Sequence, residues 1–541
     1  MPTTAEFLID RLVNNGVKHM FTLPGDYSLP FVKRLAKSPI ELVGTTSEVT
    51  AGFAADAYAR IKGISAVCVT YCVGGFNLIN AVGGAFAEKS PVVVISGSPG
   101  IKERQEDVLL HHMVGQFECQ HKVFSNITCA NTVLRDPDRA CFEIDRVLSA
   151  CQHYKQPVYI ELPRDMVDKP IRYDPYTVGT PRDEVSDREN LEEALLEVTK
   201  WINESSQPVI WAGVEIARYG LGDKLMKFVE QTGIPVATDI LGKSVVNECH
   251  PLCLGVYSES TSRDAVKDYI ARSDCLIMLG VMMTDMSLGF LPLRCQRRNI
   301  VSASSQSLQI RNHSFNRVKF VDFFEGLCKA KLIKREIVSV PHPTIAPWSA
   351  ASGKKLTAVR LFEKINSILT EDMAVVADIG DSLFGALDMV IRKQNQFICP
   401  AFYTSMGFAV PGALGVQIAN SRLRPIVLVG DGAFQMTGVE FSTMVRRGLN
   451  PIVFVVNNGG YATERILMEG SFNDLQSWNF ENVPALVGGG FGVKVMTEDQ
   501  LDEAIVKALG SRQASIINCV LDKTDYTPAL QRMFSRLAKQ I

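Results

Sequence analysis

Residues 425–432 read Pro-Ile-Val-Leu-Val-Gly-Asp-Gly, and residues 457–460 read Asn-Asn-Gly-Gly. We expect strands at 426–429 and 452–456, because both runs are short, apolar and rich in β-branched side chains, with a helix at about 438–447 between them. A strand–helix–strand unit is right-handed and puts both strands in one parallel sheet. Asp431 and Asn458 should therefore leave the same edge of that sheet, about 4.8 Å apart if the strands are neighbours.

Side chains at such an edge can hold a metal-bridged diphosphate. The Asp431 carboxylate and the Asn458 amide oxygen are both suitable ligands for a hard divalent cation. Glycines let the backbone approach an anion, and the N-terminus of the following helix favours negative charge. Gly-Asp-Gly alone is most often a turn, and Asn-Asn-Gly-Gly alone is an ordinary loop. Their joint occurrence at the ends of two parallel strands therefore carries the prediction.

Short β-branched runs alternate with amphipathic helical stretches along the chain, which is typical of an α/β protein with helix-covered parallel sheets. We expect three doubly wound parallel-sheet domains at 1–180, 190–337 and 356–541, with a linker at 338–355. The linker is rich in Pro, Ser, Thr and Ala, and a polar segment at 176–190 ends the first domain. Further strands are expected at 41–44, 66–70, 92–95, 158–161, 208–213, 234–238, 275–280, 374–377 and 516–521.

The composition excludes several classes of protein. The chain has 541 residues, 46% of them hydrophobic, and 56 Lys and Arg against 58 Asp and Glu without a polybasic block, so nucleic acid is not an expected partner. The N-terminus turns acidic at Glu6 before any apolar run, and the uncharged stretches at 63–87 and 394–421 are broken by Gly, Asn, Ser or Pro. We therefore expect neither an export signal nor a membrane span. Thirteen cysteines predict reduced thiols and a cytoplasmic location.

At this separation, the Gly-Asp-Gly and the terminal Asn-Asn resemble the fingerprint of thiamine diphosphate enzymes. The resemblance implies thiamine diphosphate as cofactor and Mg²⁺ as its metal, with the Asp431 carboxylate, the Asn458 side chain and the main-chain carbonyl of Gly460 as ligands. It also implies cofactor contacts at Gly430, Gly432, Ala433 and Tyr461.

Glu48 follows the strand at 41–44 and opens the segment 48–63, whose small apolar residues suggest a closely packed helix. A carboxylate at a helix start is common, because it interacts favourably with the helix dipole. The segment also resembles the helix that carries the glutamate of thiamine diphosphate enzymes. This resemblance implies that Glu48 lies beside the aminopyrimidine ring and shifts it toward the imino form that deprotonates the thiazolium carbon.

Two further motifs indicate a group within this family. One is Leu-Pro-Gly-Asp-Tyr at 23–27, which contains Asp26, and the other is the pair of consecutive histidines His111 and His112. Adjacent histidines on a helix cannot face the same way, and a chance pair would usually include one solvated and one packed ring. Beside the fingerprint, however, these residues resemble the Asp and His-His set of the non-oxidative 2-oxo acid decarboxylases, the pyruvate and indolepyruvate decarboxylase group. The resemblance spans the whole chain, and Glu464 matches the second active-site acid. Otherwise Glu464 is a solvent-facing residue in an i, i+4 pair.

Other segments match cofactor contacts of this family. Met406 falls where a large apolar residue supports the bent cofactor, and Thr404 where a carbonyl meets the aminopyrimidine; otherwise Met406 is core packing. Thr70, Gly380 and Ser382 complete the expected contacts. Asp381 departs from the usual Gly-Thr-Ser phosphate loop, so its contact with the diphosphate stays open.

The resemblance implies pyrimidine-binding, central and diphosphate-binding domains, and conversion of a small-molecule 2-oxo acid to an aldehyde and carbon dioxide. None of the four Trp residues falls in the expected substrate wall, whereas narrow pyruvate-selective relatives place bulky aromatic groups there. We therefore expect a wide apolar pocket for an aromatic, branched or longer linear acid, unless these side chains are only core. The expected wall is Met286, Ile379, Leu383, Phe384, Thr463, Leu467, Met533 and Leu537.

Other functions stay open. The chain could be a pyruvate decarboxylase, or a carboligase of the acetohydroxyacid synthase type, which often holds FAD in its middle domain; the pair at 111–112 argues against the carboligase. A non-catalytic cofactor-binding protein is disfavoured by Glu48 and Glu464. Because the family builds each cofactor site from two subunits, a homodimer or homotetramer is implied.

Overall fold

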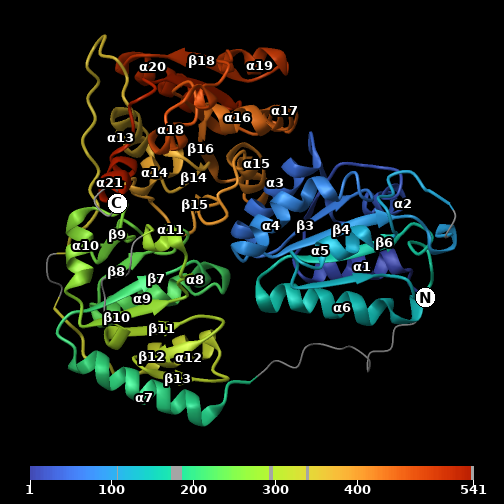
Figure 1. Ribbon diagram of the computed structural model, residues 1–541, viewed down its shortest axis with the longest axis horizontal. Coiled ribbons are helices and arrows are strands. Elements are labelled where there is room, and N and C mark those ends of the chain that lie inside the picture. Colours follow the sequence, from blue (N-terminus) through green and yellow to red (C-terminus); the bar gives the residue numbers. More distant parts are fainter. Residues whose placement is uncertain (106–107, 172–184, 291–296, 337–339, 538–541) are drawn as a thin grey trace. The chain divides into compact units, whose positions relative to one another are not determined.

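The computed structural model describes residues 1–541 except 106–107, 172–184, 291–296, 337–339 and 538–541 (Figure 1). Its strands form three sheets, which confirms the expected three-sheet α/β fold. The contacts group the chain into two compact units. The first comprises Met1–Glu184, Tyr403–Leu423 and Thr437–Leu449, and the second comprises Val185–Phe402, Arg424–Met436 and Asn450–Ile541. The domain boundaries stay a prediction, and those expected at 180 and 337–338 lie outside the described residues.

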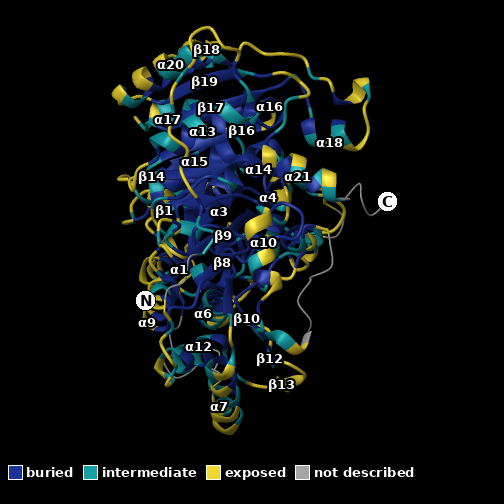
Figure 2. Ribbon diagram, turned by 90° about the vertical axis from the view of Figure 1, so that its left-hand side faces the viewer, coloured by how far each residue is buried: buried dark blue, intermediate teal, exposed yellow. Residues whose placement is uncertain are grey.

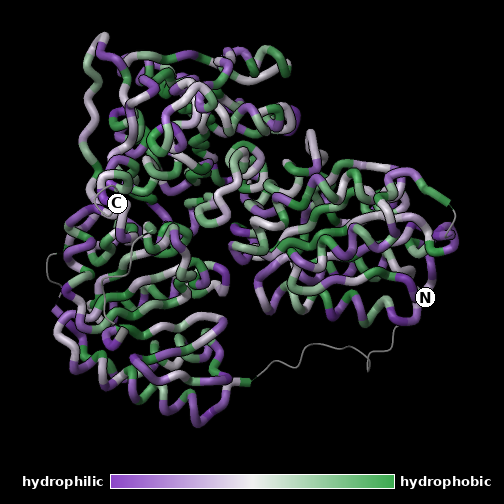
Figure 3. The backbone as a smooth tube through the Cα atoms, viewed as in Figure 1, coloured by the Kyte–Doolittle hydropathy of each residue, from purple (hydrophilic) through white to green (hydrophobic). Residues whose placement is uncertain are grey.

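The first sheet is parallel throughout, in the order β2-β1-β3-β4-β6-β5. Its inner strands are buried on both faces, which explains their continuous apolar runs (Figure 3). The strands are β1 His19–Thr22, β2 Glu41–Gly44, β3 Ser65–Val69, β4 Val92–Ser98, β5 Ala130–Val133 and β6 Val158–Pro163. The helices are α1 Thr4–Asn14, α2 Leu29–Leu35, α3 Glu48–Lys62, α4 Ile79–Ala87, α5 Cys119–Phe124 and α6 Pro137–Tyr154, with 3-10 turns η1 Phe76–Leu78 and η2 Ile101–Glu103.

The second sheet has the order β13-β12-β11-β10-β7-β8-β9 and is not wholly parallel. At one edge, β12 pairs antiparallel with β11 and β13 pairs antiparallel with β12, because the links at 304–307 and 311–312 are too short for a parallel crossover. The strands are β7 Pro208–Ala212, β8 Val236–Thr238, β9 Cys253–Val256, β10 Cys275–Leu279, β11 Ile300–Ala303, β12 Leu308–Ile310 and β13 His313–Phe315. The helices are α7 Arg188–Glu204, α8 Glu215–Arg218, α9 Gly222–Thr232, α10 Asp264–Ala271, α11 Asp285–Leu288 and α12 Phe320–Lys329, with η3 Arg297–Asn299.

The third sheet is parallel, in the order β15-β14-β16-β17-β19-β18. The expected pairing of the two motif-bearing strands is confirmed, with Gly430 of β16 opposite Val456 of β17. The strands are β14 Met373–Ala377, β15 Phe397–Ile398, β16 Arg424–Gly430, β17 Ile452–Asn457, β18 Phe491–Val495 and β19 Ser515–Val520. Most helices of this part belong to the second unit: α13 Ala358–Ile368, α14 Asp381–Leu387, α18 Ala462–Leu467, α19 Val483–Leu486, α20 Glu498–Gly510 and α21 Pro528–Leu537, with η5 Ser471–Asn473 and η6 Phe480–Asn482.

The segment between β16 and β17 differs from the expected single helix at 438–447. α16 Asp431–Thr437 begins directly after β16, and η4 Gly438–Glu440 then leads into α17 Phe441–Arg446. Thr437 has φ −140° and ψ 1°, which ends the first helix and changes the chain direction. Asp431 is thus the first residue of a helix rather than part of a free turn, which places its charge at a helix N-terminus.

Within the first unit, α15 Ala409–Ala419 packs directly on α3. Both helices are rich in Ala and Gly, and both are buried along most of their length (Figure 2). A Cβ atom on Gly415 would lie 2.0 Å from the carbonyl oxygen of Ala54, so the two backbones approach more closely than any side chain would allow. Among the described helices, none has both the length and the apolar character needed to cross a bilayer.

Candidate active site

The Asp431 carboxylate joins the two motifs of the third sheet. It lies at the end of β16, is 4% exposed, and accepts a hydrogen bond from the amide of Gly432 at 2.8 Å. The backbone amides of Gly459 and Gly460, beyond the end of β17, lie close enough to the same carboxylate to lower its pKa. Burial raises the pKa of Asp431 to about 6, although these amides act in the opposite direction. The two loops therefore meet at one carboxylate.

The second asparagine of the pair is the one available to a ligand. Asn457 donates from Nδ2 to Oδ1 of Asn518 on β19 at 3.0 Å, so its side chain faces the neighbouring strand. Asn458 is buried in the next turn, beside Gly459. Gly460 has φ 157°, and a Cβ there would lie 2.1 Å from the carbonyl oxygen of Asn473, so the close backbone approach requires glycine. The structure thus brings together Asp431 and the Asn458–Gly460 turn.

This donor set fits Mg²⁺. A carboxylate, an amide oxygen and a backbone carbonyl are hard oxygen ligands, which Mg²⁺ prefers. A buried carboxylate with a raised pKa is also destabilised as an anion, and a divalent cation would compensate that cost.

The loop after β14 reaches the same edge of the sheet, because β14 pairs with β16 in parallel. Gly380 has φ 86°, and Ser382 is buried in the first turn of α14. A Cβ on Gly380 would lie 3.6 Å from Oγ1 of Thr463, which places α18 beside this loop. Asp381 points elsewhere: its carboxylate accepts hydrogen bonds from the amide of Thr527 at 3.0 Å and from the Thr527 hydroxyl.

The expected substrate wall divides into buried and exposed members. Met286, Leu383, Phe384 and Met533 are buried in one apolar cluster, and Ile379 packs against it. The remaining positions lie on or near α18 or at the chain end. Thr463 is half-buried, Glu464 is exposed, Leu467 is 65% exposed, and the side chain of Leu537 lies outside the described residues.

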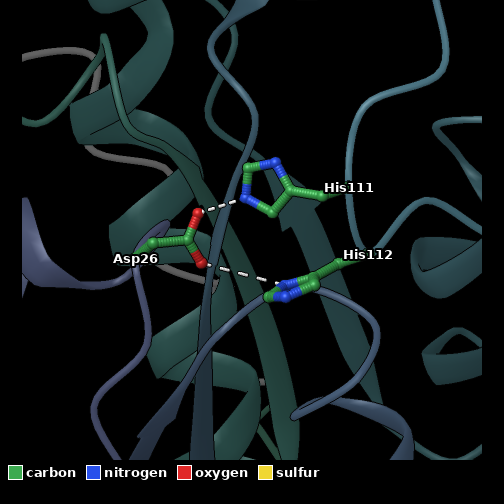
Figure 4. Close-up of side chains that lie close together, drawn as sticks. All are labelled: Asp26, His111 and His112. Atoms are coloured by element: carbon green, nitrogen blue, oxygen red, sulfur yellow. Dashed lines mark hydrogen bonds and ion pairs between the residues drawn. The ribbon is translucent and has the colours of Figure 1, made fainter.

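In the first unit, Asp26 faces both histidines (Figure 4). Its Oδ2 lies 2.5 Å from Nε2 of His111, and its Oδ1 lies 3.8 Å from Nδ1 of His112. Residues 111–112 form a turn rather than a helix, and His112 has φ 65°. This left-handed backbone lets two consecutive rings face one carboxylate, which a helix would prevent. Partial burial alone would raise the pKa of Asp26, but the hydrogen bond from His111 lowers it.

Tyr27 completes this cluster and was not predicted. Its ring stacks on His111 with centroids 4.7 Å apart and planes 14° apart, and it meets His112 edge-on at 5.9 Å. The Tyr27 hydroxyl lies 3.3 Å from Nδ1 of His111, but near-parallel rings put that oxygen above the imidazole plane, away from the lone pair. Stacking is therefore the main contact. The only sequence feature that could have indicated Tyr27 is its position next to Asp26 in the chain.

Glu48 begins α3 and reaches the turn after β3. Nδ2 of Asn77, a second residue that was not predicted, donates to Oε2 of Glu48 at 3.0 Å. A Cβ on Gly74 would lie 3.2 Å from Oε1 of Glu48, so this turn packs tightly beside the carboxylate. Thr70, at the start of the same turn, donates from Oγ1 to Asp26 at 3.5 Å.

The loop before α15 also belongs to the first unit. Thr404 has φ 57°, an uncommon conformation for a β-branched residue. Met406 is half-buried, between Ser405, which accepts from Nδ2 of Asn80 at 2.7 Å, and Gly407, whose carbonyl accepts from Thr437 at 2.6 Å. The expected aminopyrimidine-side residues thus lie in the first unit, and the expected metal and diphosphate residues lie in the second.

Comparisons with known proteins identify the class of the chain. Models of thiamine pyrophosphate enzymes match the chain in three parts: the N-terminal TPP binding domain at 2–122, the central domain at 195–324 and the C-terminal TPP binding domain at 378–519. The chain therefore belongs to the thiamine pyrophosphate enzymes.

Similar proteins narrow the class further. An indole-3-pyruvate decarboxylase of Azospirillum brasilense is 34% identical over 94% of this chain and 93% of its own length. A probable pyruvate decarboxylase of Schizosaccharomyces pombe is 31% identical over 98% of this chain and 95% of its own length. An alpha-keto-acid decarboxylase of Mycobacterium tuberculosis is 31% identical over 99% of this chain and 98% of its own length. Within its class, the chain is a thiamine diphosphate-dependent 2-oxo acid decarboxylase.

Proposed function

We propose that the preferred substrate is a bulky, apolar 2-oxo acid, that Mg²⁺ carries the diphosphate of the cofactor, and that Asp431, Asn458 and Gly460 hold this ion. The observation that carries the proposal is the shared carboxylate. Amides from the end of β17 meet Asp431 from the end of β16, so both motifs converge on one point. Gly430, Gly432, Ala433 and Tyr461 border it, and Gly380 and Ser382 reach the same sheet edge.

Each acidic group has a defined task in this proposal. When bound, thiamine diphosphate supplies the electron sink that accepts the pair released as carbon dioxide leaves. Asn77 fixes Oε2 of Glu48, which leaves Oε1 to hold a proton for the pyrimidine nitrogen. Asp26 and His111 hold a proton at Nε2 and can deliver it to the product, with His112 beside them. Glu464 is exposed on α18 and can orient the carboxylate of the acid or exchange a second proton.

Adaptable side chains favour a bulky substrate. Met286 and Met533 lie in one buried cluster with Leu383 and Phe384. Methionine is unbranched and fills irregular spaces, so these positions suit aromatic, branched or longer linear side chains. The indole-3-pyruvate and alpha-keto-acid decarboxylases among the relatives are compatible with this class, and so is pyruvate.

The central sheet argues against a dinucleotide-dependent carboligase. In such sheets, dinucleotides bind beyond the carboxyl ends of the strands, at the point where the strand order reverses. In the central sheet this point lies between β7 and β10. A Cβ on Gly213 would lie 2.3 Å from the carbonyl of Gly280, so the two loops are already in contact. The buried Glu215 carboxylate accepts from the amide of Ser305 at 2.7 Å. An acid is thus already buried in the first turn of α8, after β7.

The assembly and location are proposed on other grounds. We infer a homodimer or homotetramer, because the two groups of expected site residues belong to different units of the chain and the family completes such sites between subunits. The cysteines that the structure describes are all free, which suits a reducing cytoplasmic setting.

The test is aldehyde release across a panel of 2-oxo acids, from pyruvate through phenylpyruvate to eight-carbon acids, with and without Mg²⁺ and thiamine diphosphate. We expect bulky acids to give the highest kcat/KM, and Glu48→Gln to lower kcat by at least about a hundredfold. Glu189→Gln is the matched control, because Glu189 also lies in the first turn of a helix, α7. Faster turnover of pyruvate than of every bulky acid would reject the pocket argument. Unchanged turnover in Glu48→Gln would reject the role of Glu48.

A further inference from the structure

We propose that Asp381 is a positioning residue that anchors the start of the C-terminal helix α21 and thereby fixes the depth of the substrate pocket. The inference rests on the proposed function for the identity of the pocket. The anchor itself is a contact between residues of the second unit.

The contact is buried and made of several hydrogen bonds. Asp381 is 6% exposed, and Thr527 is fully buried. The amide of Thr527 donates to Oδ2 at 3.0 Å and to Oδ1 at 3.3 Å, and the Thr527 hydroxyl donates to Oδ1. Hydrogen bonds to an ionised group are about twice as strong as those between neutral groups. A single side chain thus holds both donors of Thr527.

The position of Asp381 explains why its carboxylate turns away from the diphosphate loop. It is the first residue of α14, and Thr527 immediately precedes Pro528, the first residue of α21. The carboxylate therefore lies at the N-terminal ends of two helices, whose dipoles both favour negative charge. Burial still raises the pKa of Asp381 to about 6, partly offset by the Thr527 hydrogen bonds.

The other end of α21 is held by two arginines. Arg532 donates from Nε to the carbonyl of Thr261 at 2.8 Å, and it pairs with Asp388 at 2.8 Å. Arg536 donates to the carbonyl of Ser260 at 2.6 Å and to Asp264 at 2.6 Å. These contacts fix the C-terminal half of the helix against the loop before α10.

An apolar face of α21, next to the side that carries these arginines, packs into the cluster that holds most of the expected substrate wall. Ala529, Leu530 and Met533 are buried in the same cluster as Met286, Leu383 and Phe384. Leu383 and Phe384 follow Asp381 on α14, within one turn of the anchor. The Asp381–Thr527 contact therefore sets how α14 and α21 lie against each other, and with them how far Met533 reaches into the cluster.

The experiment compares Thr527→Val with Thr527→Ser in the holoenzyme. Valine keeps the shape of the threonine side chain but lacks the hydroxyl, whereas serine keeps the hydroxyl. We expect Thr527→Val to increase hydrogen exchange of the α21 amides about tenfold, the effect of losing roughly one hydrogen bond to a charged group. It should also reduce the preference for an eight-carbon 2-oxo acid over pyruvate, measured as the ratio of their kcat/KM values, by about tenfold. Thr527→Ser should stay within about twofold of the unchanged enzyme in both readouts.

Asp381→Asn tests the partner. It should shift both readouts in the same direction, and Asp381→Asn combined with Thr527→Val should add little to either single change. Unchanged exchange of α21 in Thr527→Val would overturn the anchor, even in an active decarboxylase. Increased exchange with an unchanged substrate ratio would overturn the link to the pocket. If the unchanged enzyme releases no aldehyde from any acid, the proposed function is wrong. Hydrogen exchange of the α21 amides would still test the Asp381–Thr527 contact in that case.

Discussion

At the scale of single residues, Glu498 shows how one buried charge fixes the segment before the third sheet. It is fully buried at the start of α20, where Arg360 of α13 donates to its two oxygens at 2.9 and 2.8 Å. The amide of Ala351 donates to it at 3.0 Å, and Arg360 also reaches the carbonyl of Ser349. The hydrogen bonds from Arg360, more than any other contact, lower the pKa of Glu498 to about 2. Glu498 therefore stabilises the fold as an anion.

This lowered pKa predicts a pH-dependent cost for Glu498→Gln. The stabilisation is fully present above the unfolded pKa of 4.5 and is lost as the pH falls through that value toward 2. We expect the variant to lower the free energy of unfolding by about 2–3 kcal/mol at pH 7, and the difference to shrink steadily below pH 4.5. Urea unfolding at several pH values measures it. Glu503→Gln, at an exposed position of the same helix, is the control; a difference independent of pH would contradict the assignment.

Two residue-level features lay beyond what the sequence could predict. The pair at 111–112 was recognisable, but the φ of 65° that turns both rings toward Asp26 depends on the surrounding loop. Likewise Asp381 stood out as an unusual charge, yet its partner Thr527 is 146 residues away, and no local pattern connects them.

At the scale of elements, the packing of α15 on α3 depends on missing side chains. Gly415 approaches the carbonyl of Ala54, and Gly52 of α3 approaches Ala81 of α4, where added Cβ atoms would lie 2.0 and 2.5 Å away. Because Glu48 is the first residue of α3, this packing also fixes the position of its carboxylate.

We therefore predict that Gly415→Ala destabilises the protein by about 1–3 kcal/mol, because the added methyl group must push the two helices apart. This overpacking outweighs the roughly 1 kcal/mol that alanine gains over glycine in a helix. Gly510→Ala, at the end of α20 with no atom within 4 Å of the new Cβ, should be neutral or slightly stabilising. Thermal unfolding of both variants measures the contrast. Equal effects in the two would mean that α3 and α15 are not closely packed.

The sequence predicted most strands and the parallel pairing of β16 with β17, because buried parallel strands are short apolar runs bounded by glycine or polar residues. It missed the start of α16 at Asp431, since Gly-Asp-Gly is a turn signal as well as a helix start. It also missed the antiparallel edge formed by β12 and β13, whose strands are only three residues long.

At the scale of the whole molecule, each of the two compact units carries its own group of expected site residues. The first unit holds Glu48 and the Asp26 cluster, and the second holds the Asp431 carboxylate and the apolar cluster around Met533. The sequence could name these residues as candidates, because most of them lie in short recognisable motifs next to a strand or a helix start. It could not predict their local partners, which come from distant parts of the chain.

The binding of thiamine diphosphate, measured by titration calorimetry with Mg²⁺ or with a chelator, tests the role of Asp431 most directly. We predict that the unchanged protein binds the cofactor only with Mg²⁺, and that Asp431→Asn weakens binding by at least about a hundredfold, the loss expected for an ionic ligand worth roughly 3 kcal/mol. Asp372→Asn, at the opposite end of the same sheet, should bind normally. Equal affinity with and without the metal, or in Asp431→Asn, would contradict the proposed metal site.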